Sequence, residues 1–124
     1  MIFGIGIDMI EVERVADRMG KPGFRELVFS QHEIDYCENK AMKHEHYAAR
    51  FAAKEAFFKA IGRGWRNGTA FNEVEIYNAE EGKPEIRLLG NTANTINDMK
   101  LGKIFVSLSH LKTMATAMVI IESL

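Results

Sequence analysis

The feature that most constrains this chain is one long alanine-rich segment, residues 46–61. It contains no glycine or proline. At about 100° per residue, its apolar side chains surround nearly the whole circumference of a helix. A helix that is apolar all round belongs in a core or an interface. The rest of the chain must therefore be built around this helix, which we expect to end at Gly62.

Shorter elements are predicted on both sides of the long helix. Residues 2–10 form an apolar strand, 11–19 an amphipathic helix and 24–29 a short helical piece. Ser30 and Glu33 form a capping box, which predicts a helix that runs to about residue 39, before a polar connector over 40–45. Two hairpins follow, 71–77 with 84–89 and 104–109 with 114–121, separated by a helix over 92–99. These elements predict a single α+β domain over residues 1–124, with a mostly antiparallel sheet against a few helices.

Composition narrows the classes of function. The 124 residues carry a net charge of −1, so no overall field favours nucleic acid or an anionic membrane as a partner. The single cysteine, Cys37, has no intrachain partner, which suits a reducing compartment. Asp8 interrupts the opening apolar stretch, which argues against a signal peptide, and no apolar run approaches the ~20 residues of a membrane span. We therefore expect a cytoplasmic protein.

Asp8 is the first residue that folding alone explains poorly. It ends the opening strand, after Gly4 and Gly6. A carboxylate there is costly unless it is paired or bound to a metal. The alternative is helix capping, in which Asp8 accepts hydrogen bonds from free backbone N–H groups. The glycines favour the first interpretation slightly, because they allow another backbone or a ligand to come close.

Charged side chains also interrupt the long helix. Glu55 shares one helical face with two phenylalanines, and Lys59 lies about 40° from it. Arg50 and Lys54 share another side. The usual explanation, a Glu55–Lys59 ion pair on a solvated stripe, would contribute about 0.2–0.5 kcal/mol. Few polar residues remain to make such a stripe, and charges inside an apolar helix usually pair or bind something.

A third polar group ends a predicted strand. Ser107 and Ser109 lie on one face of this strand, and His110 follows at the turn. Hydroxyls and an imidazole at a strand end can hold a phosphate. The alternative is a solvent-facing strand edge with an ordinary turn histidine.

Two further groups are weaker candidates. Cys37 together with His44, Glu45 and His46 offers zinc-type ligands, but their spacing fits no familiar tetrahedral signature. Residues 62–68 form a glycine-containing basic loop, which is either a plain turn or an anion-binding loop.

The strongest of these groups combine two carboxylates, cations on one helix and a serine–histidine corner. Mg²⁺ is commonly held by one or two carboxylates together with substrate phosphates. Lysine and arginine neutralise the remaining phosphate charge. The residues therefore point to Mg²⁺-dependent chemistry on a phosphate ester, without identifying the substrate.

At these positions the sequence resembles the holo-[acyl-carrier-protein] synthases, the small type of 4′-phosphopantetheinyl transferase. The matching motifs are residues 4–8 (Gly-Ile-Gly-Ile-Asp), residues 50–56 with 59–60, and residues 107–110 (Ser-Leu-Ser-His). Phe58 and Arg63 depart from the residues common in the family. The resemblance implies a homotrimer with active sites between subunits. Such an assembly would explain why the long helix is apolar all round.

The resemblance also implies roles for single residues. Asp8 and Glu55 would bind Mg²⁺, and Glu55 and Lys59 would take part in catalysis. The residues that would contact coenzyme A are Arg50, Lys54, Lys59, Gly62, Gly64, Ser109 and His110. The reaction would move 4′-phosphopantetheine from coenzyme A to a serine of an acyl carrier protein and release adenosine 3′,5′-bisphosphate. Glu55, a metal-bound water and His110 are all possible bases.

An acidic carrier protein needs a basic docking surface. Arg14, Arg18, Lys21 and Arg25 are accompanied by one acid, Asp17, which leaves a local excess of +3. We expect these four residues to form the docking surface, with a merely solvated helix face as the alternative.

Two other functions fit part of the pattern. A non-catalytic module could dock an acidic partner through the first helix, but this leaves Asp8 and Glu55 unexplained. A Mg²⁺-dependent phosphate-ester hydrolase would use the same carboxylates, but it gives the basic helix no role.

Overall fold

The computed structural model describes residues 1–62 and 68–124. Within these residues the elements, in chain order, are β1 (Ile2–Glu11), α1 (Val12–Met19), α2 (Phe24–Val28), α3 (Gln31–Glu38), α4 (Lys43–Ile61), the 3-10 helix η1 (Phe71–Glu73), β2 (Val74–Asn78), β3 (Pro84–Leu88), α5 (Gly90–Asn97), β4 (Leu101–His110) and β5 (Met114–Ser123).

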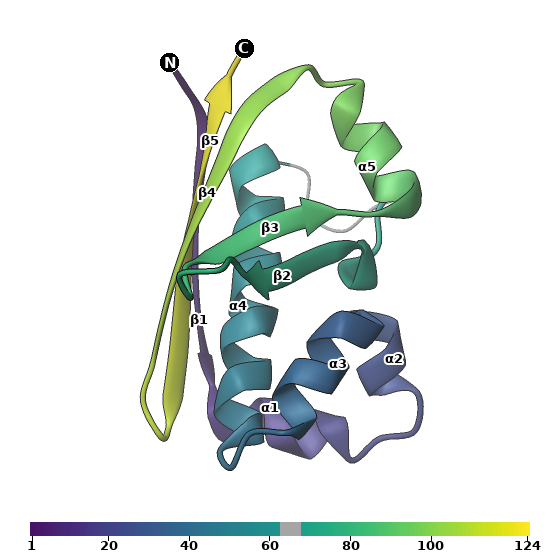
Figure 1. Ribbon diagram of the computed structural model, residues 1–124, viewed down its shortest axis with the longest axis vertical. Coiled ribbons are helices and arrows are strands. Elements are labelled where there is room, and N and C mark those ends of the chain that lie inside the picture. Colours follow the sequence, from purple (N-terminus) through teal and green to yellow (C-terminus); the bar gives the residue numbers. More distant parts are fainter. Residues whose placement is uncertain (63–67) are drawn as a thin grey trace.

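Helix α4 is the centre of the fold (Figure 1). A three-stranded antiparallel sheet of order β1-β5-β4 covers one side of it. The antiparallel pair β2-β3 and helix α3 lie against other sides, and α1 packs near its N-terminal end (Figure 1). The predicted α+β fold with a long central helix is confirmed, although the strands form two antiparallel sheets rather than one.

The apolar circumference of α4 is buried by its own chain. Alanine and phenylalanine side chains on every side of the helix are inaccessible, and even Arg50 and Lys54 are buried. The expectation that neighbouring subunits explain this helix is therefore wrong. The helix also begins at Lys43, inside the segment predicted to be a polar connector. Neither α4 nor any other helix of the described residues is long and apolar enough to cross a membrane.

Two glycines of β1 let the strand approach α4 very closely. A Cβ atom on Gly6 would lie 1.9 Å from the carbonyl oxygen of Ala56, and one on Gly4 would lie 1.9 Å from that of Ala60. Both distances are far inside van der Waals contact, so only glycine fits at these two positions. The predicted close backbone approach is therefore real, and the neighbour is α4.

The capping box is confirmed, but the strand predicted over residues 71–77 begins late. Ser30 Oγ accepts a hydrogen bond from the backbone N–H of Glu33, and Glu33 Oε1 accepts one from that of Ser30. Phe71–Glu73 forms a 3-10 turn, and β2 begins only at Val74. The turn has a tertiary cause, because Lys54 donates a hydrogen bond to the carbonyl of Phe71.

The sheet is apolar on both faces. Its inner face covers α4, and its outer face exposes large apolar side chains that alternate along β1 and continue on the neighbouring strands: Phe3, Ile5, Ile7, Met9, Phe105 and Met118. The register makes this a continuous patch, because Ile5 pairs with Ile120, which in turn pairs with Phe105. We call these residues the outer sheet face. Contiguous exposed apolar patches of this kind mark interaction sites.

The variant Gly6→Ala is expected to be strongly destabilised, because its methyl group would collide with the backbone of α4. Overpacking of this kind costs about 1–3 kcal/mol or more. Urea denaturation followed by circular dichroism measures the loss. Gly20→Ala is the control, since its Cβ would meet only the carbonyl oxygen of Asp17, at 3.4 Å. Equal unfolding free energies for the two variants would contradict the proposed contact.

Candidate active site

Asp8 and Lys59 meet where β1 crosses α4. The ammonium Nζ of Lys59 donates to Asp8 Oδ1 at 3.1 Å and to the carbonyl oxygen of Ile7 at 3.0 Å. The N-cap residue of α1 is Glu11, which makes no side-chain cap, and Asp8 lies within β1. The capping interpretation of Asp8 is therefore wrong. Lys59 remains 55% exposed, so it is anchored to the strand and still open to a ligand.

Glu55 lies close to the same pair. Burial is the main factor that raises the pKa of the Glu55 carboxyl, and the negative charge of Asp8 raises it further, whereas Lys59 and Arg18 lower it. Among the described residues, no side chain or backbone group donates a hydrogen bond to the Glu55 carboxylate. A solvated Glu55–Lys59 ion pair is not what the structure shows, because Lys59 is directed to β1 instead.

These two carboxylates fit a divalent cation. Like charges held together and partly removed from water are costly unless a cation bridges them. Within residues 1–62 and 68–124, no group of three or more His, Cys, Asp or Glu side chains could hold a metal ion. Two carboxylates leave most of the coordination shell to water and substrate oxygens, which suits Mg²⁺. The zinc interpretation of Cys37 finds no support in the described residues, and Cys37 is fully buried.

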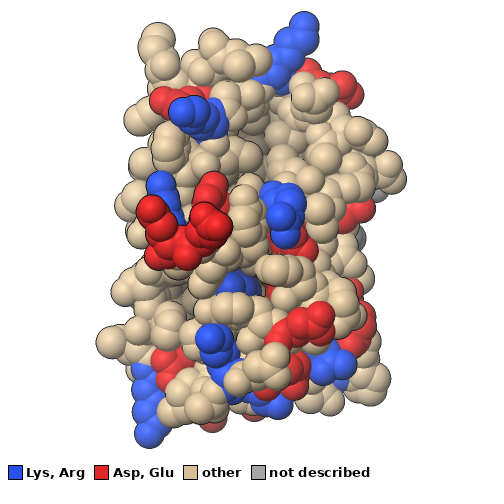
Figure 2. Space-filling model, viewed as in Figure 1, with Lys and Arg blue, Asp and Glu red and all other residues tan. Residues whose placement is uncertain are grey.

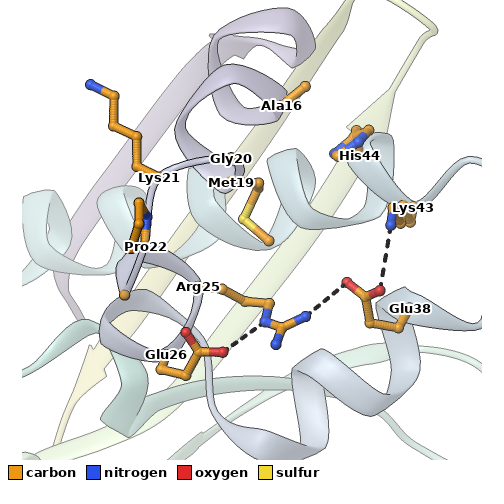
Figure 3. A pocket seen from close by; sticks show the side chains of 11 residues that line it. Ala16, Met19, Gly20, Lys21, Pro22, Arg25, Glu26, Glu38, Lys43 and His44 are labelled. Carbon is orange, nitrogen blue, oxygen red and sulfur yellow. Dashed lines mark hydrogen bonds and ion pairs between the residues drawn. The ribbon is translucent and has the colours of Figure 1, made fainter.

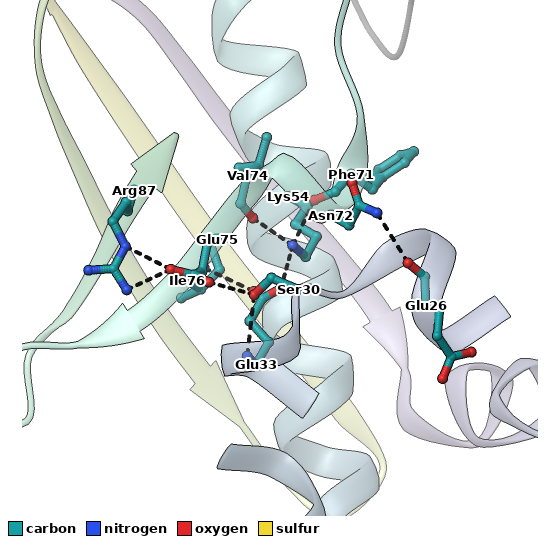
Figure 4. A network of polar contacts seen from close by, with 10 residues as sticks. All are labelled: Glu26, Ser30, Glu33, Lys54, Phe71, Asn72, Val74, Glu75, Ile76 and Arg87. Atoms are coloured by element: carbon teal, nitrogen blue, oxygen red, sulfur yellow. Dashed lines mark hydrogen bonds and ion pairs between the residues drawn. The ribbon is translucent and has the colours of Figure 1, made fainter. Parts of the chain in front are cut away.

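Lys54 does not lie in this site. Its side chain is 0% exposed, and Nζ donates to Glu33 Oε1 at 2.7 Å, to the carbonyl of Phe71 at 2.8 Å and to the carbonyl of Val74 (Figure 4). All three ammonium donors are therefore used inside the fold. Burial lowers the pKa of Lys54, and the negative charge of Glu33 opposes this change. The expectation that Lys54 binds a phosphate of coenzyme A is corrected, because no donor is left for one.

A second polar group lies on the other flank of α4. Arg50, His46 and His110 line one cavity of about 170 Å³ together with Tyr36 and Asn78. The guanidinium of Arg50 lies 4.1 Å from the centre of the Tyr36 ring, and its Nη2 donates to Asn78 Oδ1 at 3.4 Å. Arg50 is only 3% exposed, and its buried Nε has no hydrogen-bond partner in the described structure. An unsatisfied buried donor of this kind points to a missing acceptor.

The two polar groups are separated within one chain. Asp8 is on β1 and His110 is on β4, and these strands lie on opposite sides of β5. Outer strands of such a sheet are about 10 Å apart, and Glu55 and Arg50, five residues apart, lie on different sides of α4. We call the first group the carboxylate half-site (Asp8, Glu55, Lys59) and the second the arginine–histidine half-site (Arg50, His46, His110).

Ser109 and Gly62 are the remaining predicted coenzyme A residues that the structure describes. Ser109 is exposed and neighbours His110 in sequence, so on a strand the two side chains point to opposite faces of the sheet. The contact of Ser109 with coenzyme A therefore stays a prediction, because Ser109 and His110 of one chain lie on opposite faces of the sheet. Gly62 ends α4 in the left-handed conformation (φ 76°), as predicted. Gly64 and Arg63 lie among residues 63–67, outside the described residues, whereas Phe58 is a buried core residue.

The predicted docking residues divide into free and paired cations. Arg14 and Lys21 are exposed, and the guanidinium of Arg18 lies 6.0 Å from the centre of the Phe51 ring. Arg25 is paired with Glu26 at 2.8 Å and with Glu38 at 3.6 Å beside a cavity of about 470 Å³ (Figure 3). The face shown in Figure 2 likewise carries basic and acidic groups side by side. Within α1 the acids Glu13 and Asp17 equal Arg14 and Arg18 in number, so the local positive excess comes from Lys21 and from Arg25, which is itself paired.

An apolar cavity of about 380 Å³ opens beside Glu55. Arg18 and Leu27 lie on one side of it, and Phe51 and Phe71 line it from α4 and η1. Leu27 is 67% exposed although it lies at an apolar site. The cavity therefore lies between Arg18 of α1 and Glu55 of α4.

Several residues of these sites were not singled out from the sequence. Tyr36 and Asn78 come from α3 and β2. Glu45 was considered only as a zinc ligand, and its Oε1 lies 2.9 Å from His110 Nδ1. Glu33 was recognised only as a helix cap, although it also holds Lys54. Glu45 lies five residues before Arg50, on a different side of the long helix, so no spacing signal linked the two.

Comparisons with known proteins identify the family. The family model of the 4′-phosphopantetheinyl transferase superfamily matches residues 4–104. The holo-[acyl-carrier-protein] synthase of Geobacter metallireducens is 47% identical over 124 residues, which cover 98% of each chain. The chain belongs to the holo-[acyl-carrier-protein] synthases. The resemblance predicted from the three motifs is confirmed.

Solved structures of holo-[acyl-carrier-protein] synthases share the fold. The synthase of Neisseria meningitidis matches with a TM-score of 0.90 at 27% identity, over 99% of this chain and 100% of that chain. The synthase of Bacillus anthracis, in complex with CoA (3′,5′-ADP), matches with a TM-score of 0.82 at 33% identity, over 100% of this chain and 99% of that chain. Fold and family therefore agree along nearly the whole length.

The raised pKa of Glu55 predicts a pH-dependent effect of Glu55→Gln in the absence of metal. An ionised Glu55 is disfavoured in the folded state, so its penalty is absent at pH values below the unfolded pKa and grows as the pH rises through the raised folded pKa. Glu55→Gln should therefore be more stable than the wild type at pH 8 with a chelator present, and the two should converge near pH 4. Urea titrations at both pH values measure this difference.

The matched control is Glu85→Gln, which removes an exposed carboxylate from β3. Its stability should follow the wild type at both pH values. A Glu55→Gln variant that is less stable than the wild type at pH 8 would show that Asp8 and Glu55 do not repel each other as described.

Proposed function

We propose that this protein transfers 4′-phosphopantetheine from coenzyme A to a serine of an apo acyl carrier protein and releases adenosine 3′,5′-bisphosphate. The observation that carries this proposal is the meeting of Asp8, Glu55 and Lys59 at the crossing of β1 and α4, in a chain of the holo-[acyl-carrier-protein] synthase family. Coenzyme A as the substrate is supported by its presence in the Bacillus anthracis complex.

Asp8 and Glu55 would hold Mg²⁺ through their carboxylate oxygens, and Mn²⁺ could replace it because both ions favour oxygen ligands. The bound ion would supply Lewis-acid polarisation of a phosphate oxygen. Lys59, held by the backbone of β1, has the position to donate to the pyrophosphate of coenzyme A. It would neutralise the charge that develops on the bridging oxygen as the bond to the β-phosphorus breaks.

The carrier serine must lose a proton as its hydroxyl oxygen attacks the β-phosphorus. Glu55, a metal-bound water and His110 are the candidates. Without metal, burial and the charge of Asp8 raise the pKa of the Glu55 carboxyl, which would favour proton uptake. His110 of the same chain lies on the other flank of α4, with Nδ1 directed to Glu45, so His110 could act only from a neighbouring chain.

The carrier protein would dock along α1. Arg14 and Arg18 are one turn apart, Lys21 and Arg25 continue the basic surface, and the apolar cavity with Leu27 and Phe51 opens between this surface and Glu55. Interfaces commonly place apolar contacts at the centre and charges at the rim. The ion pairs of Arg25 are exposed and screened by solvent, so acidic groups of a carrier can replace them.

The active site would be completed by a second subunit in a homotrimer. The two half-sites lie on different flanks of α4, and Asp8 and His110 are on the two outer strands of the sheet. The outer sheet face offers the apolar surface that an assembly would bury. Assembly through this face would bring the arginine–histidine half-site of one chain, with Arg50 and His110 for the adenosine end, to the carboxylate half-site of its neighbour.

Each alternative function leaves part of the molecule unused. A non-catalytic docking module needs α1 but not the repelling pair Asp8 and Glu55. A hydrolase needs the pair but not an apolar cavity that joins it to α1. We also place the protein in the cytoplasm, where the unpaired Cys37 suits a reducing environment.

The direct test incubates the protein with coenzyme A, Mg²⁺ and an apo carrier protein and measures the mass of the carrier. A phosphopantetheine adduct is expected with the wild type. Asp8→Asn should lower the rate by about 100-fold or more, because it weakens metal binding. Asp98→Asn, at an exposed position after α5, should keep the wild-type rate. Absence of any adduct with the wild type, with coenzyme A cleaved instead, would support the hydrolase.

Sites shared between subunits predict complementation. Asp8→Asn and His110→Ala should each lose most activity alone, whereas co-expressed chains should recover about one quarter of wild-type activity, since one site in four then joins two intact halves. The measurement is the transfer rate of the co-purified mixture, with each variant mixed with itself as the control. A mixture no more active than its components would show that one chain holds the whole site.

A further inference from the structure

His46 lies inside the arginine–histidine half-site, although no family motif includes it. It is one turn before Arg50 on α4, and it lines the same cavity as Arg50 and His110. Its ring lies edge-on between two others: its centre is 5.8 Å from that of Tyr36 and 5.2 Å from that of His110. Packing on both sides thus fixes the ring at the wall of the cavity.

The charges around His46 are mainly positive. Arg50 on α4, Lys40 after α3 and His110 on β4 face it, and Glu45 is the one acid that acts on it among the described residues. Glu45 is already engaged with His110 Nδ1 at 2.9 Å. Burial is the main factor that lowers the pKa of His46, and His110, Arg50 and Lys40 lower it further. In the empty cavity His46 is therefore neutral near pH 7.

The cavity is built for a group with more negative charge than Glu45 supplies. The Nε donor of Arg50 is buried and unsatisfied, and Arg50 otherwise makes a single long hydrogen bond to Asn78. In coenzyme A, the pyrophosphate is assigned to the carboxylate half-site by the proposed function. The remaining phosphate is the 3′-phosphate, a monoester that carries close to two negative charges at pH 7.

Resting on the proposed function, we propose that His46 is a phosphate-binding residue that takes up a proton from solvent when the 3′-phosphate of coenzyme A binds between His46, Arg50 and His110. The bound dianion outweighs the positive charges that face the His46 imidazole. The imidazole then has a net negative environment, which favours its protonated form. The proton stays on His46 while the phosphate is bound and returns to solvent when it leaves.

The test compares coenzyme A with dephospho-coenzyme A, which lacks only the 3′-phosphate. Isothermal titration calorimetry at pH 7, in two buffers that differ in protonation enthalpy, counts the protons taken up. The wild type should take up about half a proton more with coenzyme A than with dephospho-coenzyme A. His46→Gln should lose this excess and bind coenzyme A about three- to tenfold more weakly, while its affinity for dephospho-coenzyme A stays unchanged.

The control variant is His32→Gln, which removes an exposed histidine of α3 that does not line the cavity, and it should keep the wild-type excess. The same excess in His46→Gln as in the wild type overturns the inference but leaves the proposed function intact. Failure of the wild type to bind either compound overturns the proposed function itself.

A measurement on the wild type covers the case in which His46→Gln does not fold. With ¹⁵N-labelled histidine, the ring signals of His46 report its protonation directly. Their midpoint should rise when coenzyme A is added and stay unchanged with dephospho-coenzyme A. A midpoint that responds equally to both compounds contradicts a role for the 3′-phosphate.

Discussion

The contact on which the active site depends is the close approach of β1 to α4. It is possible because Gly4 and Gly6 leave no side chain between the strand and the helix carbonyls. Two residues further along the same face, the strand presents Asp8 to Glu55 and lets Lys59 reach the carbonyl of Ile7. A larger residue at either glycine would push the strand away from the helix and separate the two carboxylates.

Lys54 and Glu55 show how helical geometry divides adjacent charges. They are about 100° apart on α4, so one turns into the fold and the other towards β1. Lys54 is satisfied by Glu33 and by two carbonyls that lead into β2, and its charge is used to join three segments (Figure 4). Glu55 has no such partner in the described structure and is left available for a ligand. The motif at residues 50–56 therefore contains Lys54, which stabilises the fold, next to Glu55, which is available to a ligand.

The sequence predicted what depends on local patterns. The long helix, the capping box of Ser30 and Glu33 and the two hairpins follow from periodicity and turn residues, and all are present. The assignments that failed depend on tertiary contacts. No local pattern shows that Phe71–Glu73 is bent by Lys54, or that the partner of Lys59 is Asp8, 51 residues away. For the same reason His46 was considered only as a zinc ligand, since its neighbours Tyr36 and His110 come from other elements.

One strand links the catalytic chemistry to the proposed assembly. Along β1 the inward residues Gly4, Gly6 and Asp8 contact α4 or its charges, and the outward residues Ile5 and Ile7 belong to the outer sheet face. Because side chains alternate with period two, a shift of one residue in the pairing of β1 with β5 would exchange these two sets. It would bury isoleucines against α4, where only glycine fits, and turn Asp8 to the apolar face. The register that turns Asp8 towards Glu55 therefore also forms the apolar outer sheet face on which the proposed assembly depends.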